Sequence, residues 1–477
     1  MNVITGREPK SLFSFFEAIS AIPRMSYREE AIADYLVAFA RERNLSCYRD
    51  ESHNVFITMP ASKGYEDRAP ILLQAHSDMV CEKNGDVEHD FLTEPLKLYT
   101  EGDWLRAKGT TLGADDGIGV AIMLAVLDGA MKEHPAVECL FTSAEEVGLD
   151  GAKQFDYSRI RARKMVNLDS ESLGVITAGC AGGLRSEVSL STKPIPFEGT
   201  ALRVSIKGLA GGHSGENIHE GRANANKLMG RLLSRVASAC GARIVSIEGG
   251  SKDNAIPREC EAIIAVKDRD LADEVLSSEA ERIAHELVAL DRSFTFTVED
   301  VQDEPFMLSE ADTNRVLAIL CTVANGVFEM NHDVAGLVEY SRNLGVICME
   351  RDTVRMIFSS RSAMESRIDA SAEELDALAR ALGAKTKHYA RYPGWNFATH
   401  SPLREAYCNA YRAVTGKEAI IKVIHAGLEC GIIFSKIPDM DIISIAPNLK
   451  NLHSPDEALD LASVEVFWKT LEQMLRL

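Results

Sequence analysis

The sequence predicts an α/β fold in which a mostly parallel sheet with helices on both faces is interrupted by a large inserted α+β domain. Three observations predict it. Short, almost continuous apolar runs that end in polar residues occur in both the first and the last part of the chain. Helical patterns lie between these runs, as expected for parallel strands buried on both faces. In the middle of the chain, strands with alternating apolar and polar residues take their place.

The N-terminal part is predicted to contain a helix. Ser26 and Glu29 have the spacing of a capping box, in which each side chain bonds a backbone amide at the start of a helix. Apolar residues at helical spacing follow from residue 31 to residue 39. We therefore expect Ser26 and Glu29 to cap this helix.

Four apolar runs are predicted to be strands of the parallel sheet, and each leads directly into polar residues. They are residues 71–73, 137–141, 165–166 and 442–445, with a helical pattern at residues 117–127. The carboxyl ends of parallel strands line the binding crevice of such a sheet. The polar residues at these ends are therefore candidates for a functional site.

The middle of the chain has the order strand, helix, strand, strand, helix, strand, which is typical of a split-βαβ layer. The predicted strands are residues 201–207, 243–247, 261–266 and 293–298, and the helices are residues 223–238 and 270–290. Residues 312–392 follow with helix, strand, strand, helix, strand, so a partial duplication is a further hypothesis. We expect residues 1–183 and 392–477 to form one domain, and residues 184–391 to form the domain inserted into it.

Composition narrows the class of protein. The chain has 477 residues and a formal net charge of −19, from 71 acidic and 52 basic residues. This acidity, with no local cluster of basic residues, argues against nucleic acid and an anionic membrane as partners. The most apolar stretch, residues 117–127, is too short to span a membrane, and the N-terminus has no signal-peptide pattern. The ten cysteines are scattered without a C-x-x-C pair, so we expect reduced thiols and a cytoplasmic location.

Histidines and carboxylates stand at the ends of the predicted strands, in an order that predicts a metal site. His76 and Asp78 follow the first strand, and Asp115 precedes the helical pattern at residues 117–127. The other members of the set are Glu145, Glu146, Asp169 and His453. Mixed imidazole and carboxylate ligands suit Zn²⁺, Mn²⁺ or Co²⁺, and one carboxylate can bridge two such ions.

Each of these residues alone also has an ordinary structural explanation. Asp115 and Asp116 could cap the helix that follows them. Glu145 and Glu146 could belong to a solvated acidic loop. The order of the whole set at successive strand ends is what favours the metal site.

Longer stretches around these residues resemble the zinc aminoacylase/carboxypeptidase superfamily of metallopeptidases with co-catalytic metals. Within it, the sequence is most similar to the aminoacyl-histidine dipeptidases, a family also called peptidase D or cytosol non-specific dipeptidases. The stretches are ILLQAHSDMVCEK, GTTLGADDGIGVA, FTSAEEVGLDGA, NLDSE, GLAGGHSGENIHEGRANA, HAGLECG and NLHSPDE. They run from residue 71 to residue 457 and therefore occur in both predicted domains.

The resemblance implies a ligand set for two divalent metal ions, with Zn²⁺ expected and Mn²⁺ or Co²⁺ as alternatives. His76 and Asp169 would bind one ion. Glu146 and His453 would bind the other, and Asp115 would bridge the two. The resemblance also implies a cis peptide bond directly after Asp115.

Further roles are implied for residues beside these ligands. Asp78 would hydrogen-bond a ligand histidine and fix its tautomer, and Glu145 would be the general base. His213 would stabilise the oxyanion from the inserted domain. Three residues are candidates for holding the substrate: Asn254, Arg361 and Gly427. The resemblance gives no role to His425 and Glu429.

The function implied by the resemblance is that of a cytoplasmic metal-dependent dipeptidase. It would hydrolyse unblocked dipeptides, X-His dipeptides included. The family favours a homodimer built through the inserted domain, the lid, whereas a partly duplicated lid could instead complete the site within one chain. Two alternatives stay open. The same two-metal site would serve an aminoacylase or a carboxypeptidase. A non-catalytic binding protein on a hydrolase fold would be expected to lack a ligand or the base, and here every matched position is intact.

Overall fold

The structure is a computed structural model that describes residues 3–287, 289–302, 305–332, 334 and 336–476. The chain divides into two compact units. Unit 1 comprises Met1–Cys180, Trp395–Val423 and Leu428–Leu477, and unit 2 comprises Ala181–Gly394 and Ile424–Gly427. The boundaries expected from the sequence lie a few residues away, and the short segment Ile424–Gly427 was expected in the other domain.

Unit 1 is built on a mixed sheet whose described strands have the order β1-β2-β6-β3-β7-β23-β8-β22. Its centre, β6-β3-β7-β23, is parallel, and antiparallel strands flank it. The strands are β1 (Ser46–Arg49), β2 (Val55–Met59), β3 (Ile71–His76), β6 (Val137–Thr142), β7 (Lys164–Asn167), β8 (Val175–Cys180), β22 (Ile420–Ile424) and β23 (Asp441–Ser444). Every residue of β3 and β6 is buried, so both faces of the sheet centre are covered, as predicted.

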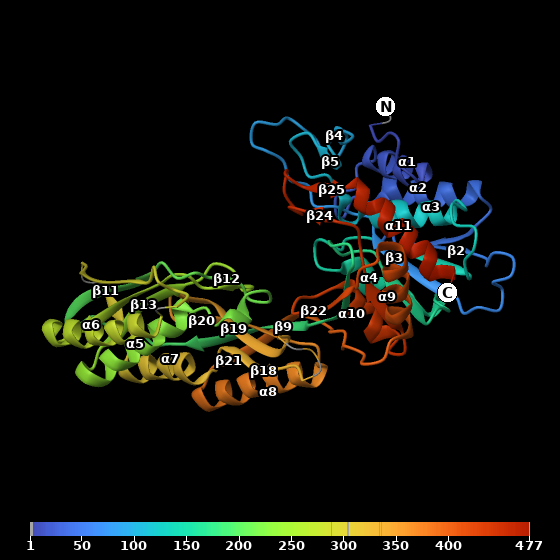
Figure 1. Cartoon of the computed structure of the whole chain (residues 1–477). Coiled ribbons are helices and arrows are strands. Elements are labelled where there is room, and N and C mark those ends of the chain that lie inside the picture. The colour runs from blue at the N-terminus through green and yellow to red at the C-terminus, as the bar shows by residue number, and fades with distance from the viewer. Residues whose placement is uncertain (1–2, 288, 303–304, 333, 335, 477) are drawn as a thin grey trace. The chain divides into compact units, whose positions relative to one another are not determined.

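Helices and one small sheet complete unit 1 (Figure 1). The helices are α1 (Lys10–Ser20), α2 (Glu30–Glu42), α3 (Ala114–Leu127), α4 (Asp150–Gln154), α9 (Pro402–Thr415), α10 (Glu429–Lys436), α11 (Leu461–Arg476) and the short η1 (Tyr157–Arg159). The small antiparallel sheet contains β4 (Leu98–Glu101), β5 (Trp104–Ala107), β24 (Leu449–Lys450) and β25 (Ala458–Asp460). Helix α3 packs on β3, whereas α9 and α10 pack on β23.

The predicted capping box is wrong. Helix α2 begins at Glu30, and its N-cap residue, Glu29, makes no side-chain capping hydrogen bond. Ser26 instead donates its hydroxyl to Asp78, and Glu29 accepts the amide of Ala144. Both side chains therefore form hydrogen bonds with residues distant in sequence and do not cap the helix.

Unit 2 contains an antiparallel sheet whose described strands have the order β16-β11-β15-β13-β19-β20-β9-β21, with β18 paired to β19. These strands are β9 (Gly182–Ser191), β11 (Thr200–Lys207), β13 (Arg243–Gly249), β15 (Cys260–Val266), β16 (Thr295–Asp300), β18 (Gly326–Met330), β19 (Val338–Glu350), β20 (Thr353–Ser362) and β21 (Lys385–Tyr392). The longer helices are α5 (Ala225–Cys240), α6 (Arg269–Glu286), α7 (Glu310–Thr322) and α8 (Glu365–Leu382). Figure 1 shows these helices together on one side of the sheet. Smaller elements are β10 (Ile195–Pro196), β12 (Gly212–His213), β14 (Ala255–Ile256), β17 (Phe306–Met307) and η2 (Ile218–Glu220).

The topology of unit 2 repeats. The series β11-α5-β13-β15-α6-β16 folds with its strands in the order β16-β11-β15-β13, the split-βαβ arrangement predicted from the sequence. The series β9-α7-β19-β20-α8-β21 folds with its strands in the order β21-β9-β20-β19. Both series place the fourth strand beside the first and the third beside the second, and β13 joins β19 to make one sheet. The sequence-based order for residues 312–392 missed strand β18.

Each unit has its own apolar core, one around β3, β6 and α3 and one between the unit 2 sheet and its helices. Among the residues that the structure describes, no helix has both the length and the apolar character needed to cross a membrane.

Candidate metal centre

The candidate centre lies at the carboxyl ends of the parallel strands of unit 1. Strand β3 ends at His76, directly beside Thr142 at the end of β6, and Gln74 is in register with Asn167 at the end of β7. Because neighbouring parallel strands end at the same edge of a sheet, the residues that follow them come together there. Asp78 follows β3, Glu145 and Glu146 follow β6, and Asp169 follows β7.

Asp115 stands between two imidazoles. Its Oδ1 lies 3.1 Å from His76 Nε2, and its Oδ2 lies 3.1 Å from His453 Nε2. His453 Nε2 is also 3.1 Å from Glu146 Oε2. Ligand atoms of His76, Asp115 and Glu146 all lie within 4.8 Å of one another, which is close enough to share a metal ion. The structure therefore brings four of the five predicted ligands into direct contact.

Asp169, the fifth predicted ligand, belongs to the same charged cluster. Burial raises the pKa of Asp169 well above its usual range, and repulsion from Asp115 raises it further. The backbone carbonyl of Asp169 accepts the hydroxyl of Ser444 at 3.1 Å, which holds this residue beside the end of β23.

The electrostatics of the centre are dominated by carboxylates around two imidazoles. Burial would raise the pKa of Asp115, but hydrogen bonds with His453 and His76 hold it well below its usual range. Burial would lower the pKa of His76, yet its hydrogen bond with Asp115 and the nearby carboxylate of Asp78 raise it well above its usual range. Hydrogen bonds with Asp115 and Glu146 raise the pKa of His453 to about 10. Such a buried, acid-rich cluster favours cations.

Asp78 contacts residues from two strand ends. Its Oδ1 is 3.4 Å from His76 Nδ1, longer than a well-formed hydrogen bond, and accepts the amide of Glu145 at 3.1 Å. Its Oδ2 accepts the amide of Glu146 at 3.3 Å and the hydroxyl of Ser26 at 2.8 Å. Asp78 is fully buried, which alone would raise its pKa, but the imidazole of His76, followed by the Ser26 hydroxyl and the Glu145 amide, keeps the pKa below the usual value.

The adjacent carboxylates Asp115 and Asp116 have different partners. Asp115 faces the imidazoles, whereas Asp116 accepts the amides of Gly119 and His76 at 3.2 and 3.3 Å. The helix-capping alternative therefore holds for Asp116 and not for Asp115. The peptide bond between the two is cis, as the resemblance implied.

Sequence reasoning gave no role to Glu457 and Arg24, which hold the backbone around the centre. The carboxylate of Glu457 accepts four consecutive amides, at 2.8 to 3.2 Å; these belong to Leu112, Gly113, Ala114 and Asp115. The buried guanidinium of Arg24 donates to the carbonyl oxygens of Ser77, Asp78 and Gly113. Glu457 lies in the motif NLHSPDE, so its position four residues after His453 was the available signal.

Glu429, which the sequence left without a role, lies beneath the centre. Its Oε2 accepts the Gln74 amide group at 2.6 Å and the Thr142 hydroxyl at 2.8 Å. Its Oε1 is buried without a hydrogen-bond partner among the described residues. Burial raises the pKa of Glu429 to about 7.

The predicted site residues of unit 2 form a cluster of their own. His213 Nδ1 accepts the amide of Glu216 at 3.3 Å, so the ring proton of the neutral imidazole is on Nε2. Burial lowers the pKa of His213, and the charge of Arg361 lowers it further, which favours this neutral form. The backbone carbonyl of Asn254 accepts the amide of Ser214, next to His213, at 2.8 Å.

Arg361 and Gly427 both lie against Tyr392. Arg361 is 4% exposed, and its Nη1 donates to the hydroxyl of Tyr392 at 2.9 Å. A Cβ atom on Gly427 would come within 2.6 Å of the Tyr392 ring, so this position requires glycine. His425, unplaced by the sequence, lies 2.7 Å by its Nε2 from the Ser341 hydroxyl, and burial lowers the pKa of His425 to about 3.

A parallel sheet edge at which one carboxylate, Asp115, lies between two imidazoles, together with an inserted split-βαβ domain, is the arrangement expected of a metallopeptidase. The chain belongs to peptidase family M20/M25/M40, whose family model matches residues 72–477. The fold class and the family resemblance inferred from the sequence are confirmed.

Relatives match over the whole chain. The chain is 38% identical over 481 residues to the cytosol non-specific dipeptidase of Escherichia coli K12, covering 100% of this chain and 99% of the relative. The crystal structure of aminoacylhistidine dipeptidase from Vibrio alginolyticus superposes on this chain with a TM-score of 0.95. The two sequences are 37% identical, and the match covers 99% of this chain and 97% of the V. alginolyticus chain. Aminopeptidase PepT from Bacillus cereus shares the fold, with a TM-score of 0.56 at 16% identity over 98% of this chain and 99% of its own.

Proposed function

We propose that this protein is a metal-dependent dipeptidase that hydrolyses unblocked dipeptides, aminoacyl-histidine dipeptides included. One geometric observation carries the proposal: Asp115 turns one oxygen to His76 and the other to His453. The two dipeptidases from E. coli and V. alginolyticus support the substrate class. The name of the E. coli relative also supports the cytosol as the compartment.

The proposed centre holds two divalent ions, Zn²⁺ first and Mn²⁺ or Co²⁺ as alternatives. His76 and Asp169 would bind one ion, Glu146 and His453 the other, and Asp115 both. The donor set fits, because imidazoles and carboxylates are the ligands these ions take, and Glu146 Oε1 is buried without a hydrogen-bond partner among the described residues. When bound, such ions act as Lewis acids that lower the pKa of water and polarise the peptide carbonyl.

Glu145 is the proposed general base. Its amide is held by Asp78, and burial raises the pKa of its carboxyl well above the usual range. A raised pKa makes a carboxylate a stronger base. A Glu145 carboxylate oxygen would take a proton from the attacking water and deliver it to the nitrogen of the scissile bond. The bond from carbon to nitrogen then breaks, leaving one free carboxylate and one free amine.

His213 is the proposed donor to the oxyanion of the tetrahedral intermediate. Its Nδ1 is occupied by the amide of Glu216, so Nε2–H is the group available for donation. A neutral imidazole donor suits this role, since it stabilises the developing negative charge without titrating near neutral pH.

Arg361, Asn254 and Gly427 are proposed to bind the substrate. Arg361 is almost completely buried yet has no carboxylate partner among the described residues, and its Nε has no hydrogen-bond partner. A substrate carboxylate would supply that partner, because a guanidinium can bind a carboxylate through two hydrogen bonds. We propose a homodimer formed through unit 2, on the family resemblance alone.

A substrate panel tests the proposed function. The metal-loaded protein is assayed with β-alanyl-histidine, other dipeptides, N-acetyl amino acids and longer peptides. We expect turnover of the dipeptides and at most trace turnover of the others. Preference for N-acetyl amino acids would favour an aminoacylase, and release of C-terminal residues from longer peptides a carboxypeptidase. A protein that turns over none of them and binds no metal would be a binding protein on this fold.

A further inference from the structure

Three consecutive amides in the loop after β6 are bound by two buried carboxylates. The amide of Ala144 donates to Glu29 Oε1 at 2.8 Å. The amides of Glu145 and Glu146 donate to the two oxygens of Asp78 at 3.1 and 3.3 Å. Glu145, the proposed base, and Glu146, a proposed metal ligand, therefore lie on a backbone segment whose amides are bound by the carboxylates of Glu29 and Asp78.

Ala144 has an unusual conformation for a residue with a side chain. Its φ of 48° lies in the left-handed region, which few residues other than glycine, asparagine and aspartate adopt. A residue stays there only where its surroundings hold it. The hydrogen bond to Glu29 fixes the Ala144 amide, and the direction of the backbone at Ala144 sets where Glu145 points.

Glu29 is not explained by an ion pair. It is 1% exposed, and no basic side chain among the described residues lies within ion-pair distance of it. Burial raises the pKa of Glu29, and repulsion from Asp78 raises it further, so the position is unfavourable for a charge. Its side chain accepts the amides of Ala144 and Tyr27, both at Oε1. The structural role of the Glu29 side chain is therefore to accept these two backbone amides.

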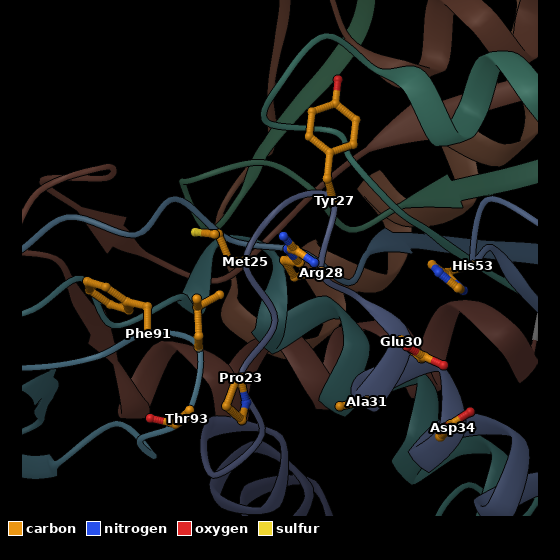
Figure 2. Close-up of a pocket in the computed structure, with 11 residues that line it drawn as sticks. Pro23, Met25, Tyr27, Arg28, Glu30, Ala31, Asp34, His53, Phe91 and Thr93 are labelled. Carbon is orange, nitrogen blue, oxygen red and sulfur yellow. The ribbon is translucent and has the colours of Figure 1, made fainter.

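The segment around Glu29 also holds the far end of the same loop. The Tyr27 hydroxyl donates to Asp150 Oδ2 at 2.9 Å, and the Asp150 amide donates to the Ala144 carbonyl at 3.0 Å. Tyr27, Arg28 and Glu30 also line a pocket of about 960 Å³, in which Figure 2 shows the Tyr27 ring directed away from the other labelled side chains. The loop from Ala144 to Asp150 is thus fastened at both ends to one segment.

We propose that Glu29 is a positioning residue for catalysis, which holds the left-handed Ala144 and thereby aims the carboxylate of Glu145. This inference rests on the proposed function, because Glu145 is the base only in a peptidase. Glu29 lies before residue 72, where the family match begins. Its hydrogen bonds are to backbone amides, so it would act through the backbone rather than on substrate or metal.

The test compares Glu29→Ala, Glu29→Gln and the control Glu30→Ala in the metal-loaded full chain. Glu30 is exposed at the start of the same helix. We expect Glu29→Ala to lower kcat about 10–100-fold, the usual range for groups that orient catalytic residues, with KM close to that of the parent protein. Glu29→Gln keeps an oxygen that can accept both amides, so it should restore most of kcat. Glu30→Ala should match the parent protein.

Two further readouts separate positioning from a general loss of structure. Metal bound per chain and the affinity in a calorimetric metal titration should stay unchanged in Glu29→Ala. If that variant does not fold, Glu29→Asp, with its carboxylate withdrawn by one methylene, should lower kcat in the same way.

Several results would overturn the inference. They are a parent-like kcat in Glu29→Ala or Glu29→Asp, no rescue by Glu29→Gln, or a kcat loss explained entirely by lost metal. If the parent protein itself hydrolyses no dipeptide, the proposed function fails instead.

Discussion

Asp78 Oδ1 accepts the backbone amide of Glu145 at 3.1 Å. The same oxygen lies 3.4 Å from His76 Nδ1, and the second oxygen accepts the amide of Glu146 at 3.3 Å. One buried carboxylate therefore connects the imidazole at the end of β3 with the loop after β6. In the proposed mechanism this couples the orientation of a metal ligand to that of the base.

Replacing Asp78 should therefore damage both metal binding and turnover. Asp78→Ala leaves the amides of Glu145 and Glu146 without their acceptor and removes the carboxylate behind His76. We expect a loss of about 10–100-fold in metal affinity and in kcat. Metal titration and steady-state kinetics measure the two effects. Asp86→Ala, at an exposed aspartate, is the matched control and should change neither; an Asp78→Ala variant indistinguishable from it would refute the coupling.

Glu457 is expected to be more important for stability than any surface carboxylate. Glu457→Ala would leave three buried amides, those of residues 112–114, and the partly buried amide of Asp115 without their acceptor. Each unpaired buried donor costs about 1–3 kcal/mol, so we expect the free energy of unfolding to fall by at least about 3 kcal/mol. Urea denaturation measures the change, with the exposed neighbour Asp456→Ala as control. Equal stability of the two variants would show that the hydrogen bonds from these four amides to Glu457 do not stabilise the fold.

Glu429 should make the stability of the metal-free protein depend on pH. Its pKa is raised to about 7, so the folded chain keeps a proton that the unfolded chain loses above about pH 4.5. Stability therefore falls as pH rises through this window. Glu429→Gln removes the titration, and its stability relative to the parent should improve by about 1–3 kcal/mol between pH 5 and pH 8.

Thermal unfolding of the metal-stripped proteins at the two pH values measures this change. The variant Glu373→Gln, at an exposed glutamate, should show no such improvement. A stability difference between Glu429→Gln and the parent that is the same at both pH values would show that Glu429 does not titrate in this range.

Arg361 should contribute to affinity only for substrates that carry a free terminal carboxylate. Losing a hydrogen-bonded charge pair costs about 1.5–3 kcal/mol, so Arg361→Met should raise KM for dipeptides about 10–100-fold. The same variant should leave KM for the corresponding dipeptide amides almost unchanged. Arg380→Met, at an exposed arginine, is the control for loss of positive charge. An equal rise in KM for dipeptides and for dipeptide amides would show that Arg361 does not bind the terminal carboxylate of the substrate.

The sheet and its strand ends were predictable because the signal is local. Continuous apolar runs that end in His76, in the segment before Glu145, or in the segment before Asp169 mark buried parallel strands, and parallel strands bring their ends together. The family motifs then supplied the roles. The repeat in unit 2 was less visible, because the two series share topology rather than a recognisable residue pattern, and β18 adds a strand to the second.

Other parts of the centre depend on tertiary contacts that no local pattern encodes. Ser26 and Glu29 match a capping box, yet each is bound by a residue far along the chain, so the local interpretation was wrong. Arg24 gives no signal at all, since its partners are backbone carbonyls of distant residues. No local pattern separates Asp115 from Asp116: the family resemblance assigned Asp115 to the metals, and the fold shows that Asp116 bonds the helix instead.

The central claim is a centre of two metal ions that serves Glu145 as base. The most direct measurement strips the protein of metal, restores Zn²⁺, counts the ions per chain and assays dipeptide hydrolysis, in parallel with Glu145→Ala. We expect activity to disappear on stripping and to return with two ions per chain. Glu145→Ala should bind the same two ions and lose about 10²–10⁴-fold in kcat. Full activity with no bound metal, or substantial activity in Glu145→Ala, would contradict the account.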